Sequence, residues 1–161
     1  MGTVESNQPL KVQIISGAYP PMKAGEADHC YRIASYLAER NVNVKVITTA
    51  GSSLPDRSKV QDVIPDWSWR DLPLLLWTVW RYKPDAVLLY YIGFIYNDHP
   101  MITFFPSLCK MVSRRARVVV MFAYPHGSKV GKQSFLSRAL RRVVQWGIGA
   151  QGVDYEFGTL L

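Results

Sequence analysis

The chain has 161 residues, of which 48% are apolar and 19% are charged, and its formal net charge is +7. Its length suits one domain that can bury its own core, and the composition excludes an intrinsically disordered chain. The longest apolar stretch, residues 72–80, is far shorter than the roughly 20 residues that a membrane-spanning helix needs. Residues 1–9 are polar and lack the apolar core of a signal peptide, so they are predicted to be a flexible tail on a cytoplasmic protein.

The first predicted elements form a βαβ unit. Apolar residues predict a strand at 11–16, a loop broken by Gly and Pro follows at 17–25, and small or apolar residues at helical spacing predict a helix from Gly25 to Arg40. Asn41 can take the left-handed conformation that ends a helix, and a second strand is predicted at 44–48.

The same alternation continues along the chain. Further strands are predicted at residues 60–64, 86–91 and 117–122. The strand at 60–64 is expected to lie at an edge of the sheet. Further helices are predicted from an Asp71 cap to about Trp80, from a Thr103 cap to about Arg114, and from 135 to about 147. The loops 92–102 and 123–133 join these elements. Alternating strands and helices predict an α/β fold with a Rossmann-like, doubly wound and mainly parallel sheet.

Two residue types have a predicted structural role. Four of the five tryptophans lie between Asp66 and Tyr82, and we interpret this cluster as buried core rather than as a ligand platform. Within it, Trp67 and Trp69 are expected to cover the sheet edge. The two cysteines, Cys30 and Cys109, lie far apart without metal-ligand spacing, which predicts buried free thiols in a reducing compartment and no metal site.

Three landmarks occur in a telling order. They are Tyr19-Pro20-Pro21 followed by Gly25, the helix end Leu37-Ala38-Glu39-Arg40 before an apolar strand, and Pro84-Asp85 before another. This order resembles the amino-terminal, acceptor-binding domain of the family 4 (group 1) retaining glycosyltransferases of the GT-B fold. The family usually has a Gly pair in the loop and Gly-His after the helix, where this chain has Ala24-Gly25 and Asn41-Val42.

The resemblance covers residues 10–161 and only the first half of such an enzyme, since the nucleotide-sugar domain that follows in the family is absent from this chain. It implies transfer of a sugar from a nucleotide-sugar donor to a membrane-linked, lipid-linked or polysaccharide acceptor, with no cofactor beyond that donor substrate. The isolated domain is expected to be inactive. The alternative is a non-catalytic Rossmann-like binding module that acts at a membrane surface or on a protein partner.

Candidate site residues lie on the loops that follow the strands, because ligands of parallel sheets gather at the carboxyl ends of the strands. Gly25, with Ala24 and Glu26 beside it, is predicted to lie near the donor phosphate, because glycine permits close approach and a helix start favours anions; a plain tight connection is the alternative. The residues predicted to bind the acceptor are Lys23, Asp28, Asn97, Asp98, His99, Tyr124 and Ser128. His126 resembles the family's sugar-contacting histidine and is the catalytic candidate, although it lies about two residues farther from the strand; a solvated loop histidine is the alternative.

The net charge comes from one segment. Residues 99–153 hold nine Lys or Arg and no acid. A nucleic-acid partner is not expected, because no binding motif is present. A solvated face and an attraction to anionic lipid or to a phosphate-linked acceptor stay open, and the second is favoured. It would place the protein at the inner face of a membrane, and the side chains expected to face the lipid are Lys129, Lys132, Arg138, Arg141 and Arg142.

Overall fold

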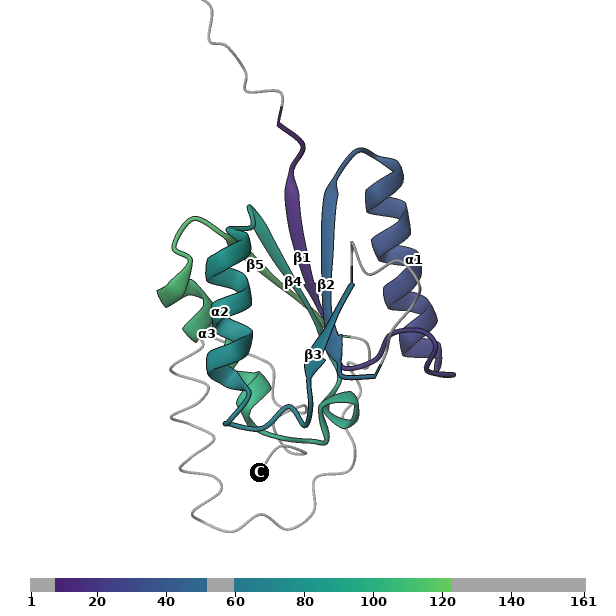
Figure 1. Ribbon diagram of the computed structural model, residues 1–161, viewed down its shortest axis with the longest axis vertical. Helices are drawn as coiled ribbons and strands as arrows, with labels where there is room; N and C mark the ends of the chain where they lie inside the picture. Colours follow the sequence, from purple (N-terminus) through teal and green to yellow (C-terminus); the bar gives the residue numbers. More distant parts are fainter. Residues whose placement is uncertain (1–7, 52–59, 123–161) are drawn as a thin grey trace, which may run out of the picture.

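The computed structural model describes residues 8–51 and 60–122 (Figure 1). Within them, five parallel strands form one sheet in the order β3-β2-β1-β4-β5. The strands are β1 (Lys11–Ile15), β2 (Asn43–Thr49), β3 (Val60–Ile64), β4 (Ala86–Tyr91) and β5 (Arg117–Phe122). Each was predicted within two residues, and β3 lies at the edge as expected.

Helices cover both faces of the sheet (Figure 1). They are α1 (Gly25–Glu39), α2 (Leu72–Tyr82) and α3 (Met101–Val112), and a 3-10 helix, η1 (Gly93–Tyr96), follows β4. Alternate residues of a strand point to opposite faces, so Ile14 packs toward α1 whereas Ile15 packs toward α2 and α3. The chain is therefore a Rossmann-like α/β domain, which confirms the predicted fold class.

The end of α1 confirms the prediction for Asn41. Its φ is 61°, and its N–H donates to the carbonyl oxygen of Ala38. The N–H of Val42 donates to the carbonyl oxygen of Leu37, and both apolar side chains pack on the core beneath α1. This is a Schellman cap, in which carbonyl groups of the last helical turn gain donors and the chain turns into β2.

The predicted start of α3 was wrong. The helix begins at Met101, two residues before Thr103, and the predicted loop 92–102 contains η1. The imidazole Nδ1 of His99 accepts the N–H of Met101 at 3.2 Å, so a histidine performs the capping expected of Thr103. Thr103 is instead buried, with its hydroxyl 3.0 Å from that of Tyr91. Pro106 consequently lies inside α3, which ends at Val112 rather than near Arg114.

The tryptophan cluster is core at only one position. Trp67 is 1% exposed and belongs to the core under α2 and α3, instead of covering an edge. Trp69, Trp77 and Trp80 are 48%, 49% and 57% exposed, so the core interpretation was wrong for them. The buried residues of α2 are Leu75, Thr78 and Val79.

Several predictions fall outside the described residues. These are the loop 123–133, the helix 135–147, and the side chains of Tyr124, His126, Ser128, Lys129, Lys132, Arg138, Arg141 and Arg142. Among the helices that the structure describes, none is long and apolar enough to cross a bilayer.

Candidate functional site

The loops that follow β1 and β4 meet at the carboxyl edge of the sheet. The backbone of Gly17 lies against the backbone of Ile95, so closely that a Cβ at Gly17 would overlap the Ile95 carbonyl oxygen. The buried hydroxyl of Tyr96 donates to the carbonyl oxygen of Tyr90 at 2.6 Å and lies 3.2 Å from that of Ile15. Two of the loops that carry predicted site residues are thus in contact.

A second set of contacts ties β2 and the chain after β3 to the same place. The hydroxyl of Thr49 donates to the carbonyl oxygen of Gly17 at 2.6 Å and accepts the indole N–H of Trp67 at 2.8 Å. The Trp67 ring meets the Tyr96 ring edge to face, with 4.8 Å between centroids. Trp67 has a φ of 57°, a strained value for a bulky residue, and these contacts hold it there.

Burial sets the ionisation of the groups in this region. It raises the pKa of Tyr96 well above its usual value, so the hydroxyl stays neutral and acts as a hydrogen-bond donor. Burial likewise raises the pKa of the free thiols, to about 12 for Cys30 and about 11 for Cys109. Neither cysteine is a thiolate nucleophile at neutral pH, and both are buried and unpaired as predicted.

The start of α1 is open. Ala24 is the N-terminal cap residue, in an extended conformation and without a side-chain cap. Apart from the adjoining residues and the backbone of α1 itself, no atom lies within 4 Å of the place where a Cβ of Gly25 would be. In the described part of the chain, the N–H groups of Gly25 and Glu26 have no acceptor, and only the next two N–H groups bond to the Ala24 carbonyl oxygen. This helix start can therefore donate hydrogen bonds to a ligand.

Carboxylates stand in the first turn of that helix. Glu26 and Asp28 both lie there, and Asp28 is 2.8 Å from the guanidinium of Arg32. Their negative charges complement the helix dipole and oppose an incoming phosphate. The arrangement suits a neutral polar ligand better than a highly charged one, since carboxylates accept hydroxyl donors while backbone N–H groups donate.

The other predicted acceptor residues are distributed over the edge. Lys23 is exposed in the loop before α1. Asn97 and Asp98 have left-handed backbones, and the side-chain amide of Asn97 donates to the carbonyl oxygen of Asp66 at 3.1 Å. His99 caps α3 and lies edge to face with Trp69, at 5.8 Å. Within the described residues, no hydrogen bond or ion pair joins Lys23 or Asp28 to the loop after β4.

One contact at this edge was missed by the sequence prediction. Nδ1 of His29, on α1, lies 3.1 Å from the hydroxyl of Tyr90, on β4, and the rings meet edge to face. Phe94 is 54% exposed on η1, and Tyr31 and Met22 are also exposed. The edge therefore offers aromatic surface beside its polar groups. No periodicity pairs a helix residue with a strand residue so distant in sequence.

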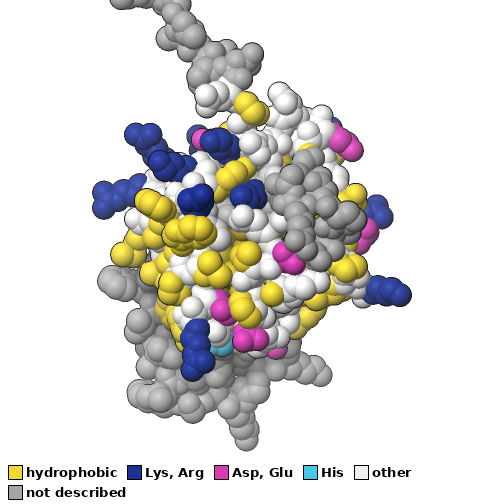
Figure 2. Space-filling view, in the orientation of Figure 1, with side chains coloured by type: hydrophobic (Ala, Val, Ile, Leu, Met, Phe, Trp, Pro, Cys, Tyr) yellow, Lys and Arg dark blue, Asp and Glu magenta, His cyan; other side chains and the backbone are white. Residues whose placement is uncertain are grey.

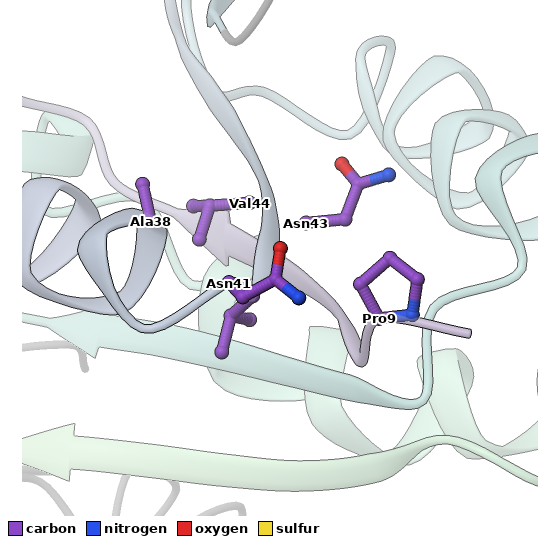
Figure 3. A pocket seen from close by; sticks show the side chains of 6 residues that line it. Pro9, Ala38, Asn41, Asn43 and Val44 are labelled. Atoms are coloured by element: carbon purple, nitrogen blue, oxygen red, sulfur yellow. The ribbon is translucent and has the colours of Figure 1, made fainter. Parts of the chain in front are cut away.

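A hollow of about 220 Å³ lies at the opposite, amino edge (Figure 3). It is lined by Pro9, Ala38, Asn41, Val42, Asn43 and Val44. Among the described residues, no charged side chain lines it, and the Asn43 side chain already accepts the hydroxyl of Tyr82 at 3.0 Å. Because ligands of parallel sheets bind at the carboxyl ends, the carboxyl edge is the better candidate site.

Among the described residues, no group of three or more His, Cys, Asp or Glu side chains could hold a metal ion. Comparisons of the chain with known protein families, with curated proteins and with solved structures found no match. The relation to GT-B glycosyltransferases thus stays a prediction from the sequence.

Proposed function

We propose that this domain binds the acceptor of a nucleotide-sugar-dependent glycosyltransferase. The observation that carries the proposal is the open start of α1 at the carboxyl edge, where the loop before it contacts η1 through Gly17 and Ile95. Unpaired N–H groups at Gly25 and Glu26, the nearby carboxylates and the exposed ring of Phe94 match what a sugar presents, namely hydroxyl groups around an apolar ring face. The ordered landmarks around Pro20-Pro21 and Pro84-Asp85 add the resemblance to this class.

Titration of the isotope-labelled chain with oligosaccharides and soluble glycolipid headgroups, followed by amide NMR, tests the proposal. We expect shift changes confined to residues 19–29 and 92–99. Gly25→Val should abolish them without lowering the melting temperature, because its side chain would fill space that is open in the free protein. Gly25→Ala is the smaller matched change. Saturable shifts at the amino-edge hollow, or a Gly25→Val variant that has a lowered melting temperature but still binds, would contradict the proposal.

The donor side requires a second domain. In the resembling family the groups that hold the nucleotide diphosphate lie mainly in the carboxyl-terminal domain, and orienting two substrates can supply roughly 7 to 11 kcal/mol of the barrier. We therefore expect no release of nucleotide diphosphate from a panel of nucleotide sugars with this chain alone, and transfer once a donor domain is joined. Sustained release that disappears in His126→Ala would overturn this division of labour.

A non-catalytic module at a membrane surface is the second candidate. The specific observation in its favour is the exposed apolar face of α2. This alternative predicts vesicle binding that no saccharide or nucleotide sugar alters, whereas a glycosyltransferase domain would show saccharide binding at the carboxyl edge as well. The contribution of the basic side chains after residue 122 stays a prediction.

A further inference from the structure

Helix α2 is apolar on both of its sides. Leu75 and Val79 face the sheet, whereas Leu74, Trp77 and Trp80 are exposed and, being three residues apart, lie on the opposite side. A helix that covers a sheet and faces water is expected to have a polar outer side. Two half-exposed indole rings on one short helix therefore indicate that the outer side of α2 contacts something other than bulk water.

The neighbouring helix extends this surface. Helices α2 and α3 pack against each other, and near the end of α3 Met111 is 73% exposed beside the exposed Lys110. Figure 2 shows apolar side chains gathered over the side where these helices lie, with Lys and Arg gathered above them. We use the name α2–α3 surface for the exposed side chains of Leu74, Trp77, Trp80, Arg81, Lys83, Lys110, Met111, Arg114 and Arg115.

The charge on this surface has one sign. Neither α2 nor α3 contains an Asp or Glu, and the cations stand at or just after the carboxyl ends of the two helices. The acid nearest in sequence to Arg81 and Lys83 is Asp85, which accepts the backbone N–H of Lys11 at 2.8 Å, and Asp71 stands at the opposite end of α2. Helix dipoles favour cations at these ends, which accounts for Arg81 and Lys110. They do not account for the indole rings beside the cations.

The tryptophans keep their polar groups available. No acceptor is found for the indole N–H of Trp77 or Trp80 in the described part of the chain, and the guanidinium of Arg81 lies 5.4 Å from the centre of the Trp77 ring. An indole with a free N–H is suited to a boundary where one end is wet and the other apolar. A cation held over that ring can meet a phosphate at the same boundary.

We propose that the α2–α3 surface binds the headgroup region of an anionic lipid bilayer. Tryptophan, leucine and methionine enter the boundary between headgroups and acyl chains, while the Lys and Arg side chains contact lipid phosphates. The absence of acids on both helices removes the repulsion that such a membrane would otherwise meet. This inference is independent of the glycosyltransferase proposal and uses described residues rather than the basic segment after residue 122.

Cosedimentation of the full chain with phosphatidylcholine vesicles, with and without phosphatidylglycerol, tests the inference. The wild type should favour the anionic vesicles and be released by salt. Trp77→Ser with Trp80→Ser should weaken binding at least tenfold. Arg114→Gln with Arg115→Gln should weaken it about twenty-fivefold, because each cation near an anionic surface contributes about fivefold. Circular dichroism checks that the variants fold.

Helix α1 provides a matched control. Arg40 stacks on the ring of exposed Tyr36, also four residues apart, on the other face of the sheet. Tyr36→Ser with Arg40→Gln should leave vesicle binding unchanged. In the intact wild type, brominated lipids should quench tryptophan fluorescence, and this quenching should be lost with Trp77 and Trp80.

Four results would overturn the inference. The first two are equal binding to neutral vesicles and an equal loss of vesicle binding in the α1 control. The third is a loss of vesicle binding in the variant with Arg138→Gln, Arg141→Gln and Arg142→Gln but not in the tryptophan variant. The fourth is a protein that binds no lipid and forms, in analytical ultracentrifugation, a dimer that the tryptophan substitutions dissociate. The last result would identify a second copy of the chain as the occupant of the surface.

Discussion

The two edges of the sheet are held together by different means. At the carboxyl edge the main contacts are buried, apart from the exposed bond of Asn97: Gly17 lies against Ile95, Trp67 against Tyr96, and the Tyr96 hydroxyl bonds to the main chain. At the amino edge the contacts are exposed: the N–H of Lys11 donates to Asp85, and the hydroxyl of Tyr82 donates to the carbonyl oxygen of Asn43 at 2.9 Å.

This difference in burial indicates at which edge the domain can tolerate substitutions. Water can replace an exposed hydrogen bond, whereas a buried partner that is lost leaves an unsatisfied group. The candidate ligand edge is therefore the firmly held one, and the edge with the hollow and the cations is held weakly. Substitutions at the two edges should separate by their effect on the free energy of unfolding.

The largest expected effect comes from Gly17→Ala. The added Cβ would overlap the main-chain oxygen of Ile95, and since a main chain cannot rotate aside, we expect a loss of about 3 kcal/mol or more in the free energy of unfolding. Urea unfolding followed by circular dichroism measures it. Gly25→Ala is the control and should change stability by less than about 1 kcal/mol, because its Cβ meets open space. Equal effects at both glycines would break the comparison.

Alkaline pH should reduce stability next most strongly. Cys30, Cys109 and Tyr96 have a higher pKa in the folded protein than in the unfolded chain, so the unfolded state loses its protons first as pH rises. Their contribution is complete below about pH 9, the ordinary pKa of a thiol, and is lost toward the folded values of about 11 and 12.

Each group should add up to about 1.4 kcal/mol of loss per pH unit within its window. Urea unfolding at a series of pH values from 7 to 11 measures this slope. Cys30→Ala with Cys109→Ala should make the curve flatter between pH 9 and 11. Stability that rises or stays constant above pH 9 in the wild type would contradict the burial of these groups.

Tyr96→Phe should cost about 1 to 3 kcal/mol, since it removes a buried hydroxyl that bonds to the main chain at Tyr90 and Ile15 while the ring stays in place. Chemical unfolding at pH 7 gives the value. The variant should also lose part of the alkaline slope, because the hydroxyl that resists ionisation is gone. A cost below about 0.5 kcal/mol would show that the hydroxyl does not hold this edge.

Tyr82→Phe is the matched substitution at the amino edge and should have the smallest effect. Its hydroxyl bonds Asn43 at the surface, where water can take its place, so we expect a loss of about 0.5 to 1 kcal/mol. The same unfolding assay applies. If Tyr82→Phe were more destabilising than Tyr96→Phe, the roles assigned to the two edges would be reversed.

The fold could be predicted because its helices and strands depend on patterns of residues that are close together in sequence. Apolar runs such as Ala86–Tyr91 and Arg117–Phe122 identify parallel strands, although only the first of these is buried, and Asn41 identifies a helix end, since each depends on neighbours in sequence. Asp71 was also the residue before α2, although its carboxylate accepts the N–H and hydroxyl of Ser68 instead of capping the helix.

The site was less predictable because its contacts join distant segments. Gly25 is conspicuous in the sequence because it stands at a helix start. Gly17, however, is the glycine at which a side chain would clash, and only its contact with Ile95 in the fold reveals this. Trp67 and Trp77 look alike in sequence, but one fills the core and the other lies at the surface. The loop after β4 was correctly placed, whereas the bond of Asn97 to Asp66 required the fold.

The contact of Gly17 with Ile95 also bears on motion. Side chains that touch can rotate apart, but two main chains that touch can separate only if a whole segment shifts. The loop after β1 and the 3-10 helix after β4 are consequently a single mechanical unit, although they are far apart in sequence. A ligand that displaces either segment should therefore displace the other as well, so the two segments of the carboxyl edge move together.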